Sequence, residues 1–160
     1  MKRALAVFGI LLVLLVFYVY FFIISPTFVS KPAMAKPAAL GANESVSTEH
    51  VEWIANEIGA YKLHPSLGGE PAVLELVADN QVFSVTITNN KPVAAEGNAV
   101  SPDIRIKGSR QAIAALLETG DINAKAIEMY RQGLISIEML KDETTLAAKG
   151  YKAIYDALNK

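Results

Sequence analysis

An uninterrupted apolar run near the amino terminus constrains the fold of this chain more than any other feature. Residues Ala4–Ile24 contain no charged side chain, and a helix needs about 20 apolar residues to cross the hydrocarbon core of a bilayer. Lys2 and Arg3 precede the run, and positive charge favours the cytoplasmic side. Pro26 follows it and ends the helix. The sequence therefore predicts a transmembrane signal-anchor helix over residues 1–24, with a cytoplasmic amino terminus and the C-terminal domain outside.

Two other interpretations of the amino-terminal run stay open. A cleaved signal peptide has an apolar core of about 7–15 residues, which is shorter than this run, although Ala33-Met34-Ala35 has the small residues of a cleavage site. A pilin-like leader is processed close to its basic end, but the helix here is bulky and aromatic rather than rich in small residues. We expect the segment to be retained as an anchor.

Residues 25–47 are rich in Pro and Ala and lack a sustained period of either helix or strand. Such a composition predicts a semi-extended linker. Asn43, followed by Glu44-Ser45, makes a candidate glycosylation triplet within it.

Residues 48–160 have the patterns of one α+β domain. Helical spacing of apolar residues predicts a helix that begins at Thr48. Alternation of apolar and polar residues, together with Asx turns, predicts strands. The expected fold is a five-stranded, mostly antiparallel sheet covered by helices, in the order α-ββββ-αα-β-α. The expected strands are Val73–Ala78, Gln81–Thr88, Pro92–Glu96, Asp103–Lys107 and 135–139, and the expected later helices are 109–118, 123–132 and one that starts at Asp142 or Thr144.

The residues that usually carry out chemistry are scarce. The chain has no Cys and two His, and its net charge is −1, which argues against Cys-ligated metals and against a nucleic-acid binder. We interpret His50 and His64 as surface histidines, because no acidic residue stands at a metal-ligand spacing from both. Arg105, Lys107 and Arg110 form a small basic cluster, which fits a solvated strand face, with an anion contact as the alternative. We therefore expect no enzyme, no catalytic residue, no metal and no cofactor.

The C-terminal half resembles the sterol carrier protein 2 (SCP-2) lipid-transfer domain family. The resemblance rests on the polar-start strand Asp103–Lys107, on a helix running through Leu116-Leu117 to Gly120-Asp121, and on Tyr130-Arg-Gln-Gly133 before the last strand. It covers roughly residues 70–158. It implies a non-catalytic domain that encloses an apolar ligand between sheet and helices. The residues that would face this ligand are Leu116, Leu117, Ile127, Tyr130, Ile135, Ile137 and Ile154.

Two functions follow as expectations. The first is a membrane-anchored, extracytoplasmic module that binds lipid or another apolar ligand, with the bilayer as its partner. The second is a non-enzymatic accessory or assembly subunit of a membrane protein complex, which has kept the fold but holds no ligand. The absence of a catalytic motif fits both equally well.

Overall fold

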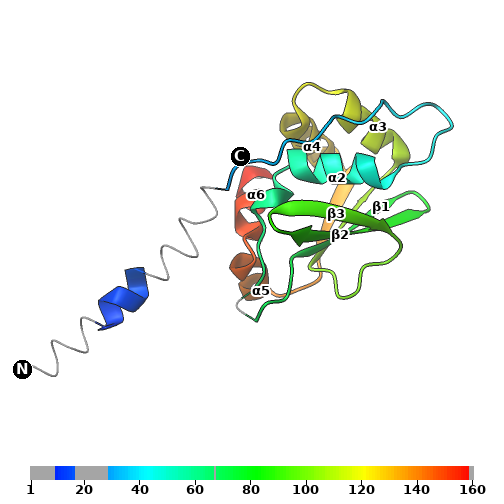
Figure 1. The fold of residues 1–160 in the computed structure, drawn as a ribbon. Helices are drawn as coiled ribbons and strands as arrows, with labels where there is room; N and C mark the ends of the chain where they lie inside the picture. The colour runs from blue at the N-terminus through cyan, green and yellow to red at the C-terminus, as the bar shows by residue number, and fades with distance from the viewer. Residues whose placement is uncertain (1–9, 17–28, 67, 159–160) are drawn as a thin grey trace, which may run out of the picture. The chain divides into compact units, whose positions relative to one another are not determined.

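The structure is a computed structural model that describes residues 10–16, 29–66 and 68–158 of the chain. It divides the chain into two compact units, Met1–Ser30 and Lys31–Lys160. The second unit holds a sheet with its helices (Figure 1). Its elements run α2 (Thr48–Glu57), the short 3-10 helix η3 (Ala60–Lys62), β1 (Val73–Ala78), β2 (Gln81–Thr88), β3 (Lys91–Glu96), β4 (Ile104–Gly108), α3 (Arg110–Glu118), α4 (Ile122–Arg131), β5 (Ile135–Met139), α5 (Glu143–Ala148) and α6 (Tyr151–Leu158).

The prediction of a transmembrane helix is wrong. Within residues 10–16, 29–66 and 68–158, no helix has both the length and the apolar character that crossing a membrane requires. Within the predicted span, residues 10–16 are helical. The rest of the span, residues 4–9 and 17–24, lies outside the described residues. The predicted single-pass membrane localisation depended on this helix and is therefore wrong as well.

The sheet is mixed, with the strand order β3-β2-β1-β4-β5. β1 and β4 are parallel, whereas the other neighbouring pairs are antiparallel. The first three strands form two tight hairpins, in which Asp79, Asn89 and Asn90 take positive φ angles as their Asx chemistry allows. After β3 the chain crosses to the far side of β1, and the Asp103 backbone N–H donates to the Val73 carbonyl at 2.8 Å, which sets the register of β4.

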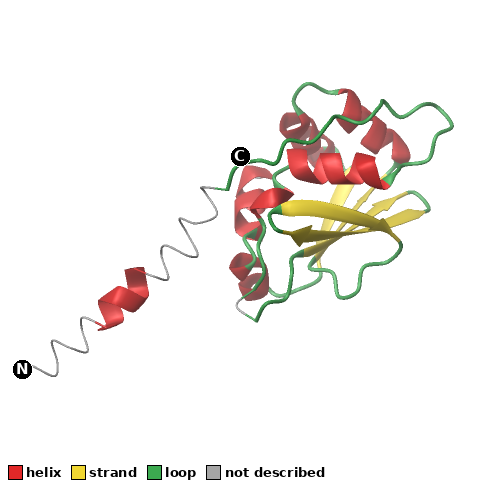
Figure 2. Cartoon of the chain, viewed as in Figure 1, coloured by secondary structure: helices red, strands yellow, loops and turns green. Residues whose placement is uncertain are grey.

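The helices cover one side of this sheet, as Figure 2 shows for α2, α3 and α4. α2 packs over β2 and β3. Side chains cap the later helices where the sequence suggested: Ser109 caps α3, and Asp142 caps α5 by accepting from the Thr145 N–H. The predicted single last helix is instead two helices, because Gly150 takes a φ of 88° between them. That left-handed conformation is open to glycine but strained for other residues.

The segment before α2 packs on the domain. Leu40 and Val46 are buried among the core residues. The Val46 backbone pairs with the Gln81 side chain in both directions, at 2.9 Å and 3.1 Å. The compact unit therefore begins at Lys31, whereas the sequence analysis placed the start of the domain at Thr48 and residues 25–47 in a linker.

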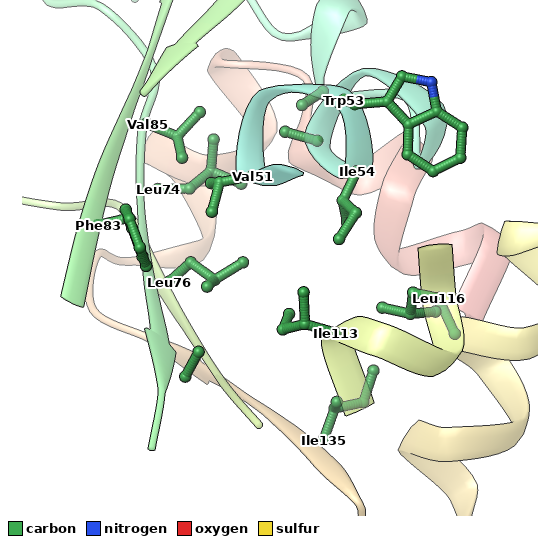
Figure 3. Close-up of a cluster of buried hydrophobic side chains, with 14 of the residues drawn as sticks. Val51, Trp53, Ile54, Leu74, Leu76, Phe83, Val85, Ile113, Leu116 and Ile135 are labelled. Carbon is green, nitrogen blue, oxygen red and sulfur yellow. The ribbon is translucent and has the colours of Figure 1, made fainter. Parts of the chain in front are cut away.

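A single hydrophobic core lies between the sheet and the helices. Val51 and Ile54 of α2 face Leu74, Phe83 and Val85 of the sheet across it (Figure 3). Leu74, Phe83 and Val85 are at most 3% exposed, because alternate strand residues point to the helix side. The apolar residues that recur at helix or strand spacing in the sequence therefore pack together in one hydrophobic core.

Candidate ligand-binding site

An apolar hollow lies in the core, lined by residues of β1, β4 and β5 and of α2, α3, α4 and α6. Its volume is about 120 Å³, and we call it the inner chamber. Figure 3 shows Ile54, Leu76 and Ile113 pointing toward a common space. Asn123 provides the only polar side chain among the described residues of its lining, which are Ile54, Ile58, Leu74, Leu76, Val77, Ile104, Ile106, Gly108, Ile113, Leu116, Asn123, Ala126, Ile127, Ile135, Ile137 and Ile154.

Strand register brings the strand side of this lining together. Leu74 stands opposite Ile104 in the parallel β1–β4 pair, and Leu76 stands opposite Ile106. Ile106 in turn pairs with Ile137 of β5. Since residues two apart on a strand share a face, these branched side chains form one apolar surface. The helix side comes from the 3.6-residue period, which places Ile113 and Leu116 on the buried stripe of α3.

Two further hollows lie next to the inner chamber or to each other, because they share lining residues. A small one of about 60 Å³, the neck, shares Ile104, Ile137 and Ile154 with the chamber. A wide one of about 570 Å³, the mouth, lies against α5 and α6. The mouth and the neck share the side chains Met139, Leu146, Tyr151 and Tyr155. We call the three hollows together the trough. Polar side chains enter the lining at the mouth, where Glu143, Thr144 and Lys152 stand.

A buried polar network lies beside the trough. The carboxylate of Asp103, which is 0% exposed, accepts from the Lys149 ammonium at 2.7 Å, from the Tyr151 hydroxyl at 3.0 Å and from the Val73 N–H at 2.8 Å. The Lys149 ammonium also donates to the Pro71 carbonyl at 2.8 Å. Burial raises the pKa of the Tyr151 hydroxyl far above its ordinary value, and the charge of Asp103 adds to the shift. Tyr151 therefore stays protonated and donates to Asp103 at every physiological pH.

The basic cluster on the outer face of the sheet has partners. Arg105 makes ion pairs with Glu75 and Glu138, and Lys107 pairs with Glu138 at 3.1 Å. The hydrogen bond to Glu75 raises the pKa of Arg105, and the hydrogen bond from Lys107 lowers the pKa of Glu138. Arg110 instead donates to backbone carbonyls of the segment before α2. These contacts give the cluster a structural role.

The seven residues predicted to face a ligand take three different places. Tyr130 lines the neck. Leu117, 1% exposed, is packed in the core and lines none of the three hollows. The other five predicted residues line the inner chamber: Leu116, Ile127, Ile135, Ile137 and Ile154.

Asn43, the glycosylation candidate, is a separate prediction. It is exposed at a turn of the segment before α2.

Sequence reasoning missed two parts of the site. It did not place Ile54 of α2 and Ile58, the residue that follows α2, against the chamber, although their apolar spacing was visible. It also missed the network around Asp103, whose partners Lys149 and Tyr151 lie 46 and 48 residues further along the chain. No local pattern links residues so far apart.

Comparisons with known proteins add structural likenesses of low identity. No protein-family model and no curated protein match the sequence. A ubiquinone synthesis protein, UbiJ-SCP2, is similar with a TM-score of 0.40 and 11% identity, over 70% of this chain and 90% of that one. Palmitated SCP2L2 from Aedes aegypti is similar with a TM-score of 0.32 and 19% identity, over 66% and 91%. The sec-alkylsulfatase Pisa1 from Pseudomonas sp. is similar with a TM-score of 0.36 and 15% identity, over 56% of this chain and 12% of that one.

Two of these structures carry the SCP2 name of the family that the sequence resembles. The likeness to them concerns the fold alone and stays below a TM-score of 0.5. Such values neither assign this chain to the family nor transfer a function to it. The trough itself is therefore the feature of this chain that bears on function.

Proposed function

We propose that this domain is a non-catalytic module that binds lipid or another apolar ligand in the trough. The observation that supports the proposal is the inner chamber, whose lining is aliphatic apart from Asn123 among the residues described. Water gains too few hydrogen bonds in such a space to occupy it, whereas apolar groups bind there. The neck shares lining residues with both the chamber and the mouth, so a chain-like ligand is proposed to reach the chamber from the mouth by way of the neck.

The non-catalytic part of the proposal rests on where the titratable groups lie. None of the described side chains that line the inner chamber is titratable. Asp103, Lys149 and Tyr151 engage one another and nearby backbone groups. Over the described ranges, no group of three His, Asp or Glu side chains is placed to hold a metal ion. The inner chamber offers a ligand shape and apolar contact rather than a reacting group.

An alternative is a non-enzymatic accessory or assembly subunit without a ligand. One observation favours it: the inner chamber, at about 120 Å³, is smaller than the roughly 300–1,000 Å³ of common small-molecule pockets. A space of this size can be a packing defect of the hydrophobic core instead of a ligand-binding site. Chemical crosslinking of the full chain in its native extract distinguishes the two functions, since an accessory subunit gives one discrete crosslinked partner and a ligand-binding module does not need one.

A binding assay on the full chain tests the proposal. The probe is a linear conjugated-polyene fatty acid, which becomes fluorescent in an apolar environment. We expect saturable binding to the wild-type chain, and loss of binding in Ile137→Trp, because Ile137 lines both the chamber and the neck. The matched control is Val100→Trp, since Val100 is 91% exposed and lies outside the trough.

Two checks keep this assay decisive. Circular dichroism establishes that Ile137→Trp is folded, and Ile127→Phe provides a second way to fill the chamber. Absence of saturable binding by the wild-type chain, or equal binding by the wild type and both filling variants, would contradict a ligand site in the trough.

A further inference from the structure

The neck is the smallest of the three hollows of the trough, and it shares lining residues with each of the other two. The neck measures about 60 Å³, the inner chamber about 120 Å³ and the mouth about 570 Å³. An apolar cavity of roughly 150 Å³ accommodates benzene, and one water molecule takes about 30 Å³ of liquid. The neck therefore has the space of a short piece of a single hydrocarbon chain and not that of a ring. The side chains that limit the size of the neck therefore select which ligands pass through it to the inner chamber.

Two of the four side chains that the mouth and the neck share are buried, and one of these two also donates a hydrogen bond to a buried carboxylate. Met139 and Tyr155, which the mouth and the neck share, are 49% and 50% exposed, and methionine in addition is flexible. Leu146 and Tyr151 also line both spaces, and each is 5% exposed. Tyr151 starts α6, directly after the positive-φ residue Gly150.

The Tyr151 hydroxyl fixes the far end of its ring to the sheet. It donates to Asp103 Oδ2 at 3.0 Å, and Asp103 is itself fixed by Lys149 at 2.7 Å and by the Val73 N–H at 2.8 Å. Turning the ring away would leave a buried carboxylate with one donor fewer. Removing a partner from a buried charged acceptor costs more than an ordinary hydrogen bond contributes. The ring is therefore a rigid wall of the neck.

We propose that Tyr151 is the specificity-determining gate of the trough, positioned by the buried Asp103–Lys149 ion pair. It admits a slim, unbranched hydrocarbon chain to the inner chamber and stops a tail that ends in fused rings. This inference rests on the proposed function, since it names which apolar ligands the same trough accepts. Asp103 and Lys149 act as positioning residues, because they hold the gate and do not themselves line the trough.

The test compares two probes on the full chain: the linear polyene fatty acid and a fatty acid whose tail ends in pyrene. The wild-type chain is expected to bind the linear probe at least roughly tenfold more tightly, the scale on which an apolar pocket discriminates by shape. Tyr151→Ala should reduce this ratio by about tenfold by admitting the pyrene tail. Tyr151→Phe keeps the ring but loses the bond to Asp103, and should give an intermediate ratio.

The outcomes separate the gate from the proposed function. Tyr61→Ala removes a tyrosine that does not line the trough and should keep the wild-type ratio. If Tyr151→Ala and Tyr151→Phe also keep that ratio while the linear probe binds, the gate is refuted and the ligand site stands. If the wild-type chain binds neither probe, the proposed function fails and the gate fails with it. A lowered ratio in Tyr151→Phe supports positioning by Asp103, since a merely structural role would change stability and not the ratio.

Discussion

At the scale of single residues, the buried ion pair between Asp103 and Lys149 has the greatest energetic consequence. Both side chains are at most 3% exposed, and 2.7 Å separates the carboxylate from the ammonium. A buried pair of this kind adds little net stability compared with apolar residues, but breaking it leaves an uncompensated charge. The effects of substituting Asp103 and Lys149 on the free energy of unfolding are therefore coupled.

Asp103→Asn should destabilise the domain by about 3–5 kcal/mol, because Lys149 would remain buried without its counter-charge. The double variant Asp103→Asn, Lys149→Met should lose less than the sum of the two single variants, since it removes both charges. Urea unfolding followed by circular dichroism gives the free energies. Strict additivity of the two substitutions would show that the charges are not coupled.

The exposed ion pairs, in contrast, should contribute little to the stability of the domain. Glu138 and Lys107 are both about half exposed where they meet at 3.1 Å, and solvent screens such pairs. Glu138→Gln therefore serves as the control for Asp103→Asn in the same unfolding experiment, with no measurable loss expected at neutral pH.

At the scale of elements, the helix pair α5–α6 depends on two local devices. The Asp142 side chain caps α5 by accepting from the Thr145 N–H at 2.9 Å and from the Thr145 hydroxyl at 2.7 Å. Gly150 then allows the turn into α6. The two devices place Tyr151, and with it the wall of the neck.

The α5 cap should make part of the free energy of unfolding depend on pH in the acidic range. The bonds from Thr145 hold the pKa of Asp142 below its ordinary value of 3.8. A carboxyl group whose pKa is lower in the folded state stabilises above its unfolded pKa, and this contribution is lost as the pH falls through the folded pKa. Urea midpoints between about pH 5 and pH 2 should therefore fall less steeply in Asp142→Asn than in the wild type. Identical slopes would exclude the cap as a source of acid sensitivity.

Gly150→Ala should destabilise the domain by roughly 1–2 kcal/mol, because a side chain strains the left-handed conformation at φ 88°. A Cβ there would also meet the His64 ring at 3.4 Å. Gly120→Ala is the matched control, since a Cβ at Gly120 meets nothing within 4 Å and its φ is not in that region. Thermal unfolding of both variants compares them, and equal midpoints would contradict the role of Gly150.

Much of the element structure could be predicted from the sequence, for local reasons. The bounds of β1 and β2 match the expected strands, because alternation and the Asp79-Asn80 turn act within a few residues. The parallel pairing of β1 with β4 could not be predicted, since it depends on a crossover between distant segments. Gly150 was present in the sequence, but an isolated glycine also occurs within helices and does not by itself predict a break.

At the scale of the whole molecule, the segment before α2 changes what counts as the domain. Val46, 1% exposed, lies in a stretch whose Pro-rich composition predicted a linker. Composition describes what a chain does in isolation, whereas Val46 is ordered by tertiary contact with Gln81. The candidate site has the same origin: its chamber residues come from β1, β4, β5, α2, α3, α4 and α6, and only the resemblance drew several of them together in advance.

Val46→Ala should cost about 2 kcal/mol, because it removes buried methyl groups and leaves a cavity. Val100→Ala is the same substitution at a residue that is 91% exposed, and it should change the free energy of unfolding little. Urea unfolding of the full chain measures both. Equal effects in the two variants would mean that the segment before α2 does not stabilise the domain.

Methyl NMR of the full chain tests directly whether an apolar ligand occupies the inner chamber. The isoleucine methyl groups are labelled, and the chain is titrated with a straight-chain fatty acid that carries a nitroxide near its tail end. We predict that the signals of Ile104, Ile113 and Ile135, which line the chamber and are at most 8% exposed, broaden before those of Ile87 and Ile122, which are 4% and 6% exposed and line none of the trough. Uniform broadening, or broadening confined to exposed groups, would contradict this prediction.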